Sequence, residues 1–306
     1  MAKVRVIIFA CCIVFSAAFI TYSQVYINEF QAANGSSALD PEFNEFSDWV
    51  EIYNAGGTVA NLSGYYISDD QFELQKWALP DVSVAAHGYL IIWANNNSTK
   101  LHANFKLDGD GEGIFLVDPS GNVIDSVIFA EQYPDISQGR FPDGGSWYMY
   151  SSPSPGLPNH ADCFDLGNKP LEAVNFNPPP GFYSGEIEVN LSHPDAQARI
   201  FYTLNGSEPD ISDHEYTDPI LLNSTKVLLA KAFRKDRLPG NDRSASYFIN
   251  ESFGLPVISL SFDSVYFWDR DIGIYLDENK SVDYSWERPV NLEIFDQRNP
   301  YISLGT

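Results

Sequence analysis

The chain has 306 residues, which is more than one β-sandwich needs and enough for two or three domains. Apolar residues make up 44% of it and aromatic residues 14%, a composition that excludes wholesale disorder and favours short strands. The formal net charge is −23, and residues 25–160 hold 4 basic residues against 18 acidic ones. Since nucleic-acid affinity depends on Lys and Arg neutralising phosphates, we expect no nucleic-acid partner.

The N-terminus has the pattern of a secretory signal peptide. Lys3 and Arg5 precede an apolar run over residues 6–20, which is short for a transmembrane helix. Small residues follow and place a cleavage site after Ser23. We therefore expect a signal peptide at 1–23, a secreted or cell-surface protein, and membrane contact only through this segment. An uncleaved anchor is the alternative.

Residues 25–160 contain short strand patterns separated by Gly-, Asn- and Asp-rich turns. Their regular spacing predicts an antiparallel β-sandwich. We expect Trp49, Ile52, Ile91 and Trp93 to contribute to its core. The predicted strands are 25–30, 49–53, 64–68, 89–94, 113–117 and 123–129.

This first region resembles the lamin tail domain family through an ordered series of motifs. They are INEF at 27–30, DWVEIYN at 48–54, LSGYYISD at 62–69, GYLIIW at 88–93, DPSGNVID at 118–125 and SPGLPN at 154–159. The resemblance implies an Ig-like sandwich over 25–160 and a binding role, and it implies no reaction.

Residues 161–173 are predicted to be a linker, since they include Gly167 and Pro170. Cys163 is the one cysteine after the predicted signal peptide, so no internal disulfide is expected in the mature chain.

A second group of strand patterns covers residues 174–249. The run ARIFYTLNGSEPD at 198–210 resembles a hairpin of the chitobiase and hexosaminidase C-terminal domain, with Asn205 where that family has Asp. The resemblance implies a second β-sandwich at 174–249 that accompanies catalysis in its family and holds no catalytic residue. Further strands are expected at 187–191 and 226–233.

Residues 250–306 resemble the start of a CotH-type kinase domain, a fold similar to protein kinases. The resemblance rests on LPVISL at 255–260, DIGIY at 271–275 and WERPVNLEIF at 286–295. The later parts of that family, which bind nucleotide and carry the catalytic acid, do not occur in these 306 residues. We expect an all-β chain of two tandem Ig-like antiparallel sandwiches followed by an incomplete third segment, a fragment of a longer protein.

The sharpest candidate metal site is DGDGEG at 108–113, where Asp108, Asp110 and Glu112 alternate with glycines. Converging carboxylates of this kind can bind calcium. An EF-hand loop that began at Asp108 would, however, have Pro119 at its twelfth position, where the bidentate acid belongs. A Gly/Asp turn between two strands is therefore favoured, and calcium binding is the alternative.

No other pattern predicts a reaction. The histidines at 87, 102, 160, 193 and 214 lack metal-ligand spacing, and no G-x-S-x-G, P-loop or dinucleotide motif occurs. Glu42, Glu45 and Asp48 share one polar loop, which is not the cleft that a glycosidase needs. We predict no catalytic, metal or cofactor-binding residue in this chain, and no enzyme activity.

Two surface features remain open to a binding interpretation. A basic cluster could contact acidic neighbours or a polyanion, or could be a solvated strand and turn; it comprises Lys226, Lys231, Arg234, Lys235, Arg237 and Arg243. Five aromatic residues could stack on sugars, although core packing is their default; they are Tyr65, Tyr66, Trp77, Tyr148 and Tyr150.

The sequence thus predicts a binding or scaffold protein that presents β-sandwich modules to a cell-envelope, glycan or protein partner, without a cofactor. The alternative is that these modules form the N-terminal targeting arm of a longer secreted CotH-type kinase-like enzyme.

Overall fold

The computed structural model describes residues 25–270, 272–275, 287–296 and 299–303, so the predicted signal peptide lies outside the described residues. Regular structure in the described part is almost entirely β, and its one helix is the short α1 (Val265–Trp268). No described helix has the length and apolarity needed to cross a bilayer. The predicted all-β class is confirmed.

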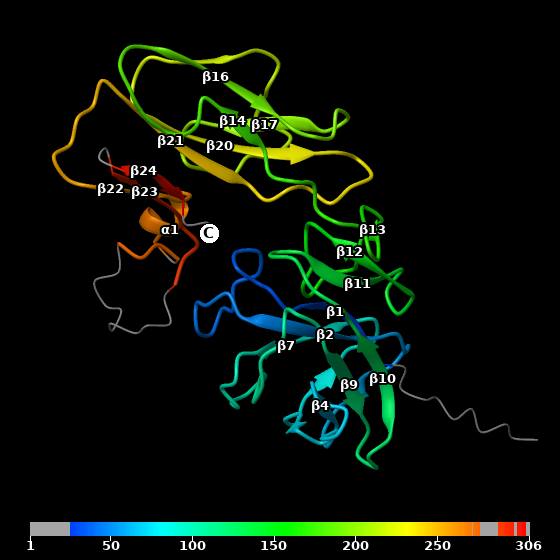
Figure 1. Ribbon diagram of the computed structural model, residues 1–306. Helices are drawn as coiled ribbons and strands as arrows, with labels where there is room; N and C mark the ends of the chain where they lie inside the picture. Colours follow the sequence, from blue (N-terminus) through cyan, green and yellow to red (C-terminus); the bar gives the residue numbers. More distant parts are fainter. Residues whose placement is uncertain (1–24, 271, 276–286, 297–298, 304–306) are drawn as a thin grey trace, which may run out of the picture.

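The first sandwich consists of two facing sheets (Figure 1). Its larger sheet has the order β13-β12-β11-β1-β2-β7-β8, formed by β1 (Val25–Gln31), β2 (Asp48–Asn54), β7 (Tyr89–Ala94), β8 (His102–Ala103), β11 (Ser137–Phe141), β12 (Ser146–Tyr150) and β13 (Phe164–Asp165). The facing sheet has the order β10-β9-β4-β5, formed by β4 (Tyr66–Ser68), β5 (Trp77–Ala78), β9 (Gly113–Val117) and β10 (Val123–Ile128). A small pair, β3 (Ala60–Asn61) and β6 (Ser83–Val84), completes it.

Alternation along β2 and β7 decides which side chains enter the first core. Val50 and Ile52 of β2 and Ile92 of β7 are fully buried in it. Ile91 and Trp93 alternate with these core residues and lie half-buried on the outer face, so the prediction that they fill the core is wrong. In the run YLIIWA the odd-numbered and the even-numbered residues are both apolar. Only the register with β2 therefore shows which of them face the core.

Trp49 is also on the outer face, although it is fully buried as predicted. It is paired with Trp93 across the strands, and its Nε1 donates a 2.9 Å hydrogen bond to Oε1 of Gln31. The outer face of this sheet is therefore covered over part of its area.

The second sandwich also has two sheets. Its larger sheet has the order β15-β21-β20-β17-β18, from β15 (Gly181–Tyr183), β17 (Arg199–Thr203), β18 (His214–Glu215), β20 (Lys226–Phe233) and β21 (Arg243–Ile249). The smaller has the order β14-β16-β19, from β14 (Asn175–Asn177), β16 (Ile187–Ser192) and β19 (Ile220–Leu222). Two short pairs in the molecule, β7–β8 and β15–β21, are parallel, which the expectation of antiparallel sandwiches did not include.

The segment predicted as a linker is tied to both sandwiches. Within it, β13 pairs with β12 of the first sandwich, and Leu171 joins the core of the second. Leu238 of the second sandwich is fully buried against Ile136 and Met149 of the first, with Phe164 packed beside them. This apolar seam fixes the two sandwiches against each other.

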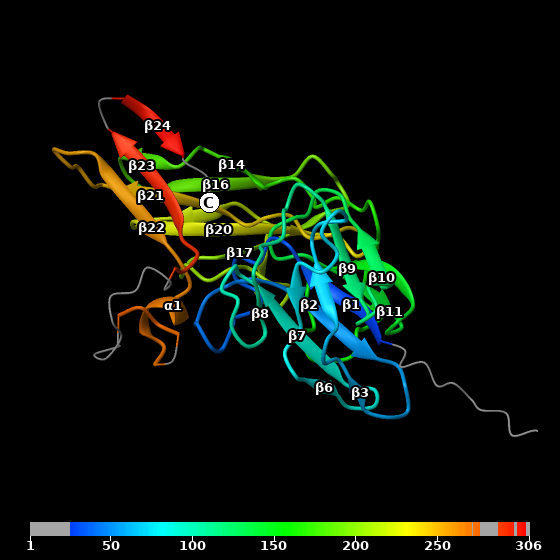
Figure 2. The same ribbon diagram turned by 90° about the horizontal axis from the view of Figure 1, so that it is seen from below.

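The third segment forms a small antiparallel sheet of β22 (Val257–Ser261), β23 (Asn291–Asp296) and β24 (Asn299–Ser303). It lies beside β21 in both views (Figures 1 and 2). Phe295 packs edge-on against Phe248 with ring centroids 5.1 Å apart, and Ser246 Oγ donates a 2.5 Å hydrogen bond to Oε2 of Glu293. The third sheet is thus attached to the second sandwich.

We expect Leu238→Ala to weaken the seam because it removes buried apolar area and leaves a cavity, at a cost of about 2–5 kcal/mol. Differential scanning calorimetry should show a lower Tm for the variant and poorer coupling between the two sandwiches. Leu221→Ala is the matched control, since Leu221 is 55% exposed. Equal Tm values for the two variants would contradict a packed seam.

Candidate ligand-binding cleft

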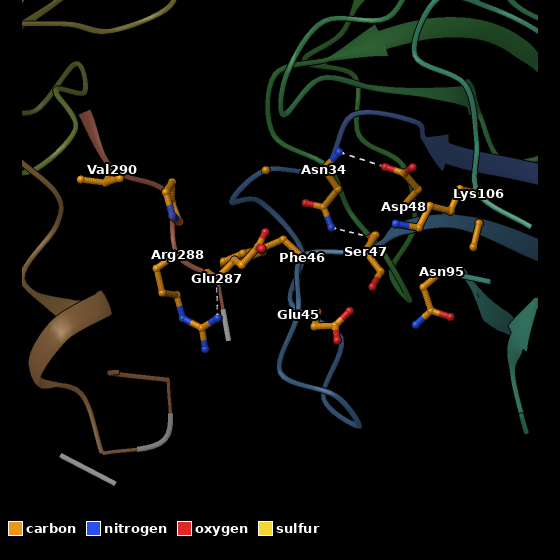
Figure 3. A pocket seen from close by; sticks show the side chains of 13 residues that line it. Asn34, Glu45, Phe46, Ser47, Asp48, Asn95, Lys106, Glu287, Arg288 and Val290 are labelled. Atoms are coloured by element: carbon orange, nitrogen blue, oxygen red, sulfur yellow. Dashed lines mark hydrogen bonds between the residues drawn. The ribbon is translucent and has the colours of Figure 1, made fainter. Parts of the chain in front are cut away.

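A cavity of about 590 Å³ lies between the first sandwich and the third segment (Figure 3). This volume is in the range of small-ligand sites. Its walls come from the loop before β2, the end of β7, Lys106 and the irregular stretch at 287–290 before β23. The lining residues include Asn34, Phe46, Asp48, Asn95, Lys106 and Arg288.

Asn34 shapes the wall that the first sandwich contributes. Its buried Nδ2 donates to the carbonyl oxygens of Ala38 (2.5 Å) and Ser47 (2.7 Å). Its backbone N–H donates to Oδ1 of Asp48 at 3.2 Å, a bond drawn in Figure 3. The loop from 34 to 48 is therefore held in one conformation, and Asp48 is fixed at the start of β2.

Asp48 is the electrostatically unusual group of the cleft. Burial raises the pKa of its carboxyl to about 6, although the Asn34 N–H and the nearby Lys106 charge lower it. Above this pKa the carboxyl is mostly ionised and accepts hydrogen bonds, and below it the protonated form has an O–H that can donate to a ligand. Lys106 is exposed beside it.

Arg288 builds the opposite wall and joins it to the first sandwich. Its Nη1 donates to the carbonyl oxygen of Asn44 at 3.0 Å, and its Nε donates to that of Ile272 at 2.8 Å. Its guanidinium lies over the Phe46 ring, 5.7 Å from the centroid. Phe46 also contacts Tyr266 edge-on at 6.1 Å. The third segment therefore closes one side of the cleft.

Carboxylate, amide, ammonium and aromatic groups line this cleft together. Such a lining suits a polar ligand with hydroxyl or amide groups, which the side chains hydrogen-bond while an aromatic ring covers an apolar face. The polar loop that holds Glu42, Glu45 and Asp48 contributes the last two to the cleft wall. Sequence reasoning placed these acids in one loop and did not anticipate the facing segment.

His102 lies behind this wall and is nearly fully buried. Its Nδ1 accepts a 3.0 Å hydrogen bond from Asn95 Nδ2, and its Nε2 lies 3.5 Å from Oε2 of Glu42. Asp40 Oδ2 lies 3.5 Å from Nδ1. The sequence does not reveal this cluster, because His102 and Glu42 are far apart in the chain. No group of three or more His, Cys, Asp or Glu in the described part could hold a metal ion.

A buried carboxylate network on the outer face of the larger sheet uses several motif residues. Glu29 accepts hydrogen bonds from Ser137 Oγ (2.6 Å) and Ser154 Oγ (3.0 Å). Glu51 accepts from Asn28 Nδ2 (2.9 Å) and from the Gly156 N–H (2.7 Å). The INEF, DWVEIYN and SPGLPN motifs therefore meet in space.

Burial gives Glu51 a strongly raised pKa of about 8, despite the hydrogen bonds that it accepts. The nearby charges of Glu29 and Asp143 raise it further. Asp143 itself accepts from Asn28 Nδ2 (3.1 Å) and Tyr89 OH (2.5 Å), so the network extends to β7.

The acidic loop at 108–113 is a turn whose acids bond its own backbone. Glu112 Oε1 accepts from the Asp108 N–H at 2.8 Å, and Asp108 Oδ1 accepts from the Asp110 N–H at 2.9 Å. Gly111 has a φ of 115°, a conformation that favours glycine. Burial raises the pKa of Glu112 to about 7.

The basic cluster is engaged mainly within the second sandwich. Arg234 bonds Asp195 (2.7 Å) and Asp236 (2.6 Å), and Lys231 forms an ion pair with Glu208. Arg237 donates to the carbonyl oxygen of Lys169. The charges of Arg234 and Lys231 are therefore balanced by acids of the same module.

The five aromatic residues considered for sugar stacking differ in how far their side chains are buried. Trp77 and Tyr150 are buried and packed inside the molecule, so they offer no stacking face. Tyr65 packs against the first core. Tyr66 and Tyr148 are half-buried on strands.

Two known families match parts of the chain. The Lamin Tail Domain family matches residues 20–130, and the Chitobiase/beta-hexosaminidase C-terminal domain family matches residues 178–243. Both resemblances drawn from the sequence motifs are confirmed over these regions, of which residues 25–130 lie in the first sandwich and residues 178–243 in the second. No curated protein matches the chain. The CotH-type resemblance of residues 250–306 stays a prediction.

The raised pKa values of Asp48, Glu51 and Glu112 predict that stability falls as pH rises. Each folded-state pKa lies above its ordinary value, so the folded protein binds more protons, and stability that is present in mild acid is lost as pH rises through about 6 to 8. We expect urea denaturation to give about 1–4 kcal/mol less stability at pH 8.5 than at pH 5.

Glu51→Gln should flatten this pH dependence, because its amide does not titrate. It should also lower stability at pH 5, since Asn28 and Gly156 donate to different oxygens of Glu51 and the NH2 group of Gln would face one of these two donors. Glu188→Gln, at an exposed strand position, is the control and should keep the wild-type slope. A wild-type slope in Glu51→Gln would show that the carboxylate network does not cause the effect.

Proposed function

We propose that this chain is a non-catalytic, exported binding and scaffold protein, and that the cleft between the first sandwich and the third segment is its ligand site. The observation that carries the proposal is the cleft itself, a cavity of about 590 Å³ whose polar wall is fixed by Asn34 and whose far wall is attached by Arg288. The two matched families support the sandwich modules as binding or scaffold units.

The ligand class follows from the lining. Asp48, Asn95 and Lys106 offer acceptors and donors, and Phe46 offers a ring. A neutral or weakly charged polar ligand, such as a glycan of the cell envelope, matches this set better than a polyanion, given the excess of acids in residues 25–160. The apolar run behind Lys3 and Arg5 supports export, which would bring the protein to such a ligand.

Binding to a panel of cell-envelope oligosaccharides, followed by calorimetric titration of the best one, tests this proposal. Phe46→Ala and Lys106→Ala should each weaken binding by about tenfold, the effect of losing one good contact. Phe72→Ala and Lys235→Ala are matched controls at exposed positions outside the cleft, and they should bind as wild type. Loss of binding in the controls alone would place the ligand elsewhere.

A second candidate function is that the modules form the targeting arm of a longer kinase-like enzyme. The third sheet supports it: its inner face packs on the second sandwich, while Ile258 (62% exposed) and Leu260 (54% exposed) remain outside. An exposed apolar face on a small sheet is typical of a layer that packs against a further element. The transcript beyond the codon for Thr306 tests this directly. A continuing kinase-like sequence would support the arm, and a stop codon would contradict it.

A further inference from the structure

The first half of β7 forms an open edge of the larger sheet. β7 pairs with β2 along its whole length, from Tyr89 to Ala94. On its other side β8 is parallel and pairs only with Trp93 and Ala94. Figure 2 shows β7 beside β2, with the short β8 near one end of it. Within the described part of the chain, the stretch from Tyr89 to Ile92 therefore has a neighbour strand on one side only.

The hydrogen-bond pattern shows which backbone groups face this edge. The Asn54 N–H donates to Gly88 O at 3.0 Å, so even-numbered residues of β7 bond β2. The Trp93 N–H donates outward to Leu101 O at 2.8 Å, which agrees with this alternation. The N–H and C=O groups of Tyr89 and Ile91 thus point away from β2. Among the described residues, no backbone or side-chain group bonds them on that side.

The side chains of this edge are apolar and held in place. Tyr89 stacks on Tyr53 with ring centroids 5.1 Å apart, and its hydroxyl donates to Asp143 at 2.5 Å. Ile91 follows on the same outer face, half-buried. An extended segment added at this edge would therefore meet a preformed apolar strip next to two free backbone donors and acceptors.

Edge strands usually carry devices that prevent unwanted pairing, such as charges, prolines or bulges. β10, the edge of the facing sheet, has such devices: its register shifts between Val123 and Asp125, and Asp125 bonds inward to Arg140 and the Ile27 N–H. β7 has no charged residue, no proline and no register shift over its length. The β10 edge is therefore protected against pairing, whereas the first half of β7 remains able to pair with another strand.

Charge indicates what kind of segment fits. Residues 25–160 hold 4 basic residues against 18 acidic ones. All four bases already face acids: Lys76 pairs with Asp69, Lys100 with Glu42 and Arg140 with Asp125, while Lys106 acts on Asp48. The unbalanced charge of this module is therefore negative. This charge repels a second copy of the chain and attracts a basic polypeptide segment.

We propose that the β7 edge binds an extended, basic segment of another polypeptide by strand addition. The new strand would bond Tyr89 and Ile91 through its backbone and place alternate apolar side chains on the strip. This site lies on the first half of β7, whereas the cleft contacts that strand only at Ala94, so the edge gives the scaffold a second, protein-directed surface.

The probe is the nine-residue peptide KVKYKVKYK, titrated into the full chain by calorimetry and by amide-exchange NMR. Binding should protect the Tyr89 and Ile91 amides from exchange. The same peptide with alternate backbone nitrogens methylated should bind at least about tenfold more weakly, since methylation removes its strand donors. Equal binding of the methylated peptide would show charge attraction alone and overturn the proposal.

Ile91→Lys places a like charge in the strip and should weaken peptide binding by about tenfold or more. Val123→Lys, the same change at an exposed residue of the β10 edge, should bind as wild type. Equal weakening in both variants would contradict a site at β7. Sedimentation of the chain alone is the remaining check: a dimer that Ile91→Lys dissociates would identify a second copy as the occupant and overturn the proposal.

Discussion

Two glutamates that are fully buried on the outer face of one sheet hold much of this molecule together. Glu29 and Glu51 are cross-strand partners on β1 and β2, and both accept hydrogen bonds from the loop at 154–159. Burial makes two adjacent carboxyls costly unless donors surround them, so the loop and the sheet stabilise each other. Gly139 completes this fit, because a Cβ there would lie 2.7 Å from Asn159 Nδ2.

The described residues after 160 are connected to this network by a series of contacts. Once the loop at 154–159 is fixed, β13 pairs with β12, and Leu171 enters the second core. Leu238 then seals the seam with Ile136 and Met149. The second sandwich in turn carries the third sheet, whose approach brings Arg288 to the loop beside the cleft. The cleft, which is lined by residues between 34 and 106 and by residues 287–290, thus depends on buried polar contacts in the first sandwich.

Much of the fold could be predicted from the sequence, because strand patterns and turn residues are local signals. The strands at 89–94, 113–117 and 226–233 have the predicted bounds. The strand patterns did not predict β11, β12 or β21. The sequences of β11 (SQGRF) and β21 (RSASYFI) mix small, polar and charged residues without clear alternation. The prediction that Ile91 and Trp93 face the core is wrong, because a continuous apolar run has no alternation that would indicate which residues point inward.

The candidate site was less predictable than the fold, because its parts are distant in sequence. The sequence places Asp48 in a polar loop, and neither its local pattern nor the family resemblances predict that Arg288 lies over Phe46. The parallel pair of β7 and β8 positions His102, and Glu42 approaches it from the loop before β2. Contacts of this kind depend on tertiary register, which local patterns do not encode.

Hydrogen–deuterium exchange of the full chain, with and without soluble cell-envelope polysaccharide, tests whether a ligand occupies the cleft. We expect slower exchange in the presence of the polysaccharide at 45–48 and 94–95, the two walls that the first sandwich gives to the cleft, and at 287–290 on the third segment. Unchanged exchange at these three stretches under saturating binding would contradict a ligand site between the first sandwich and the third segment.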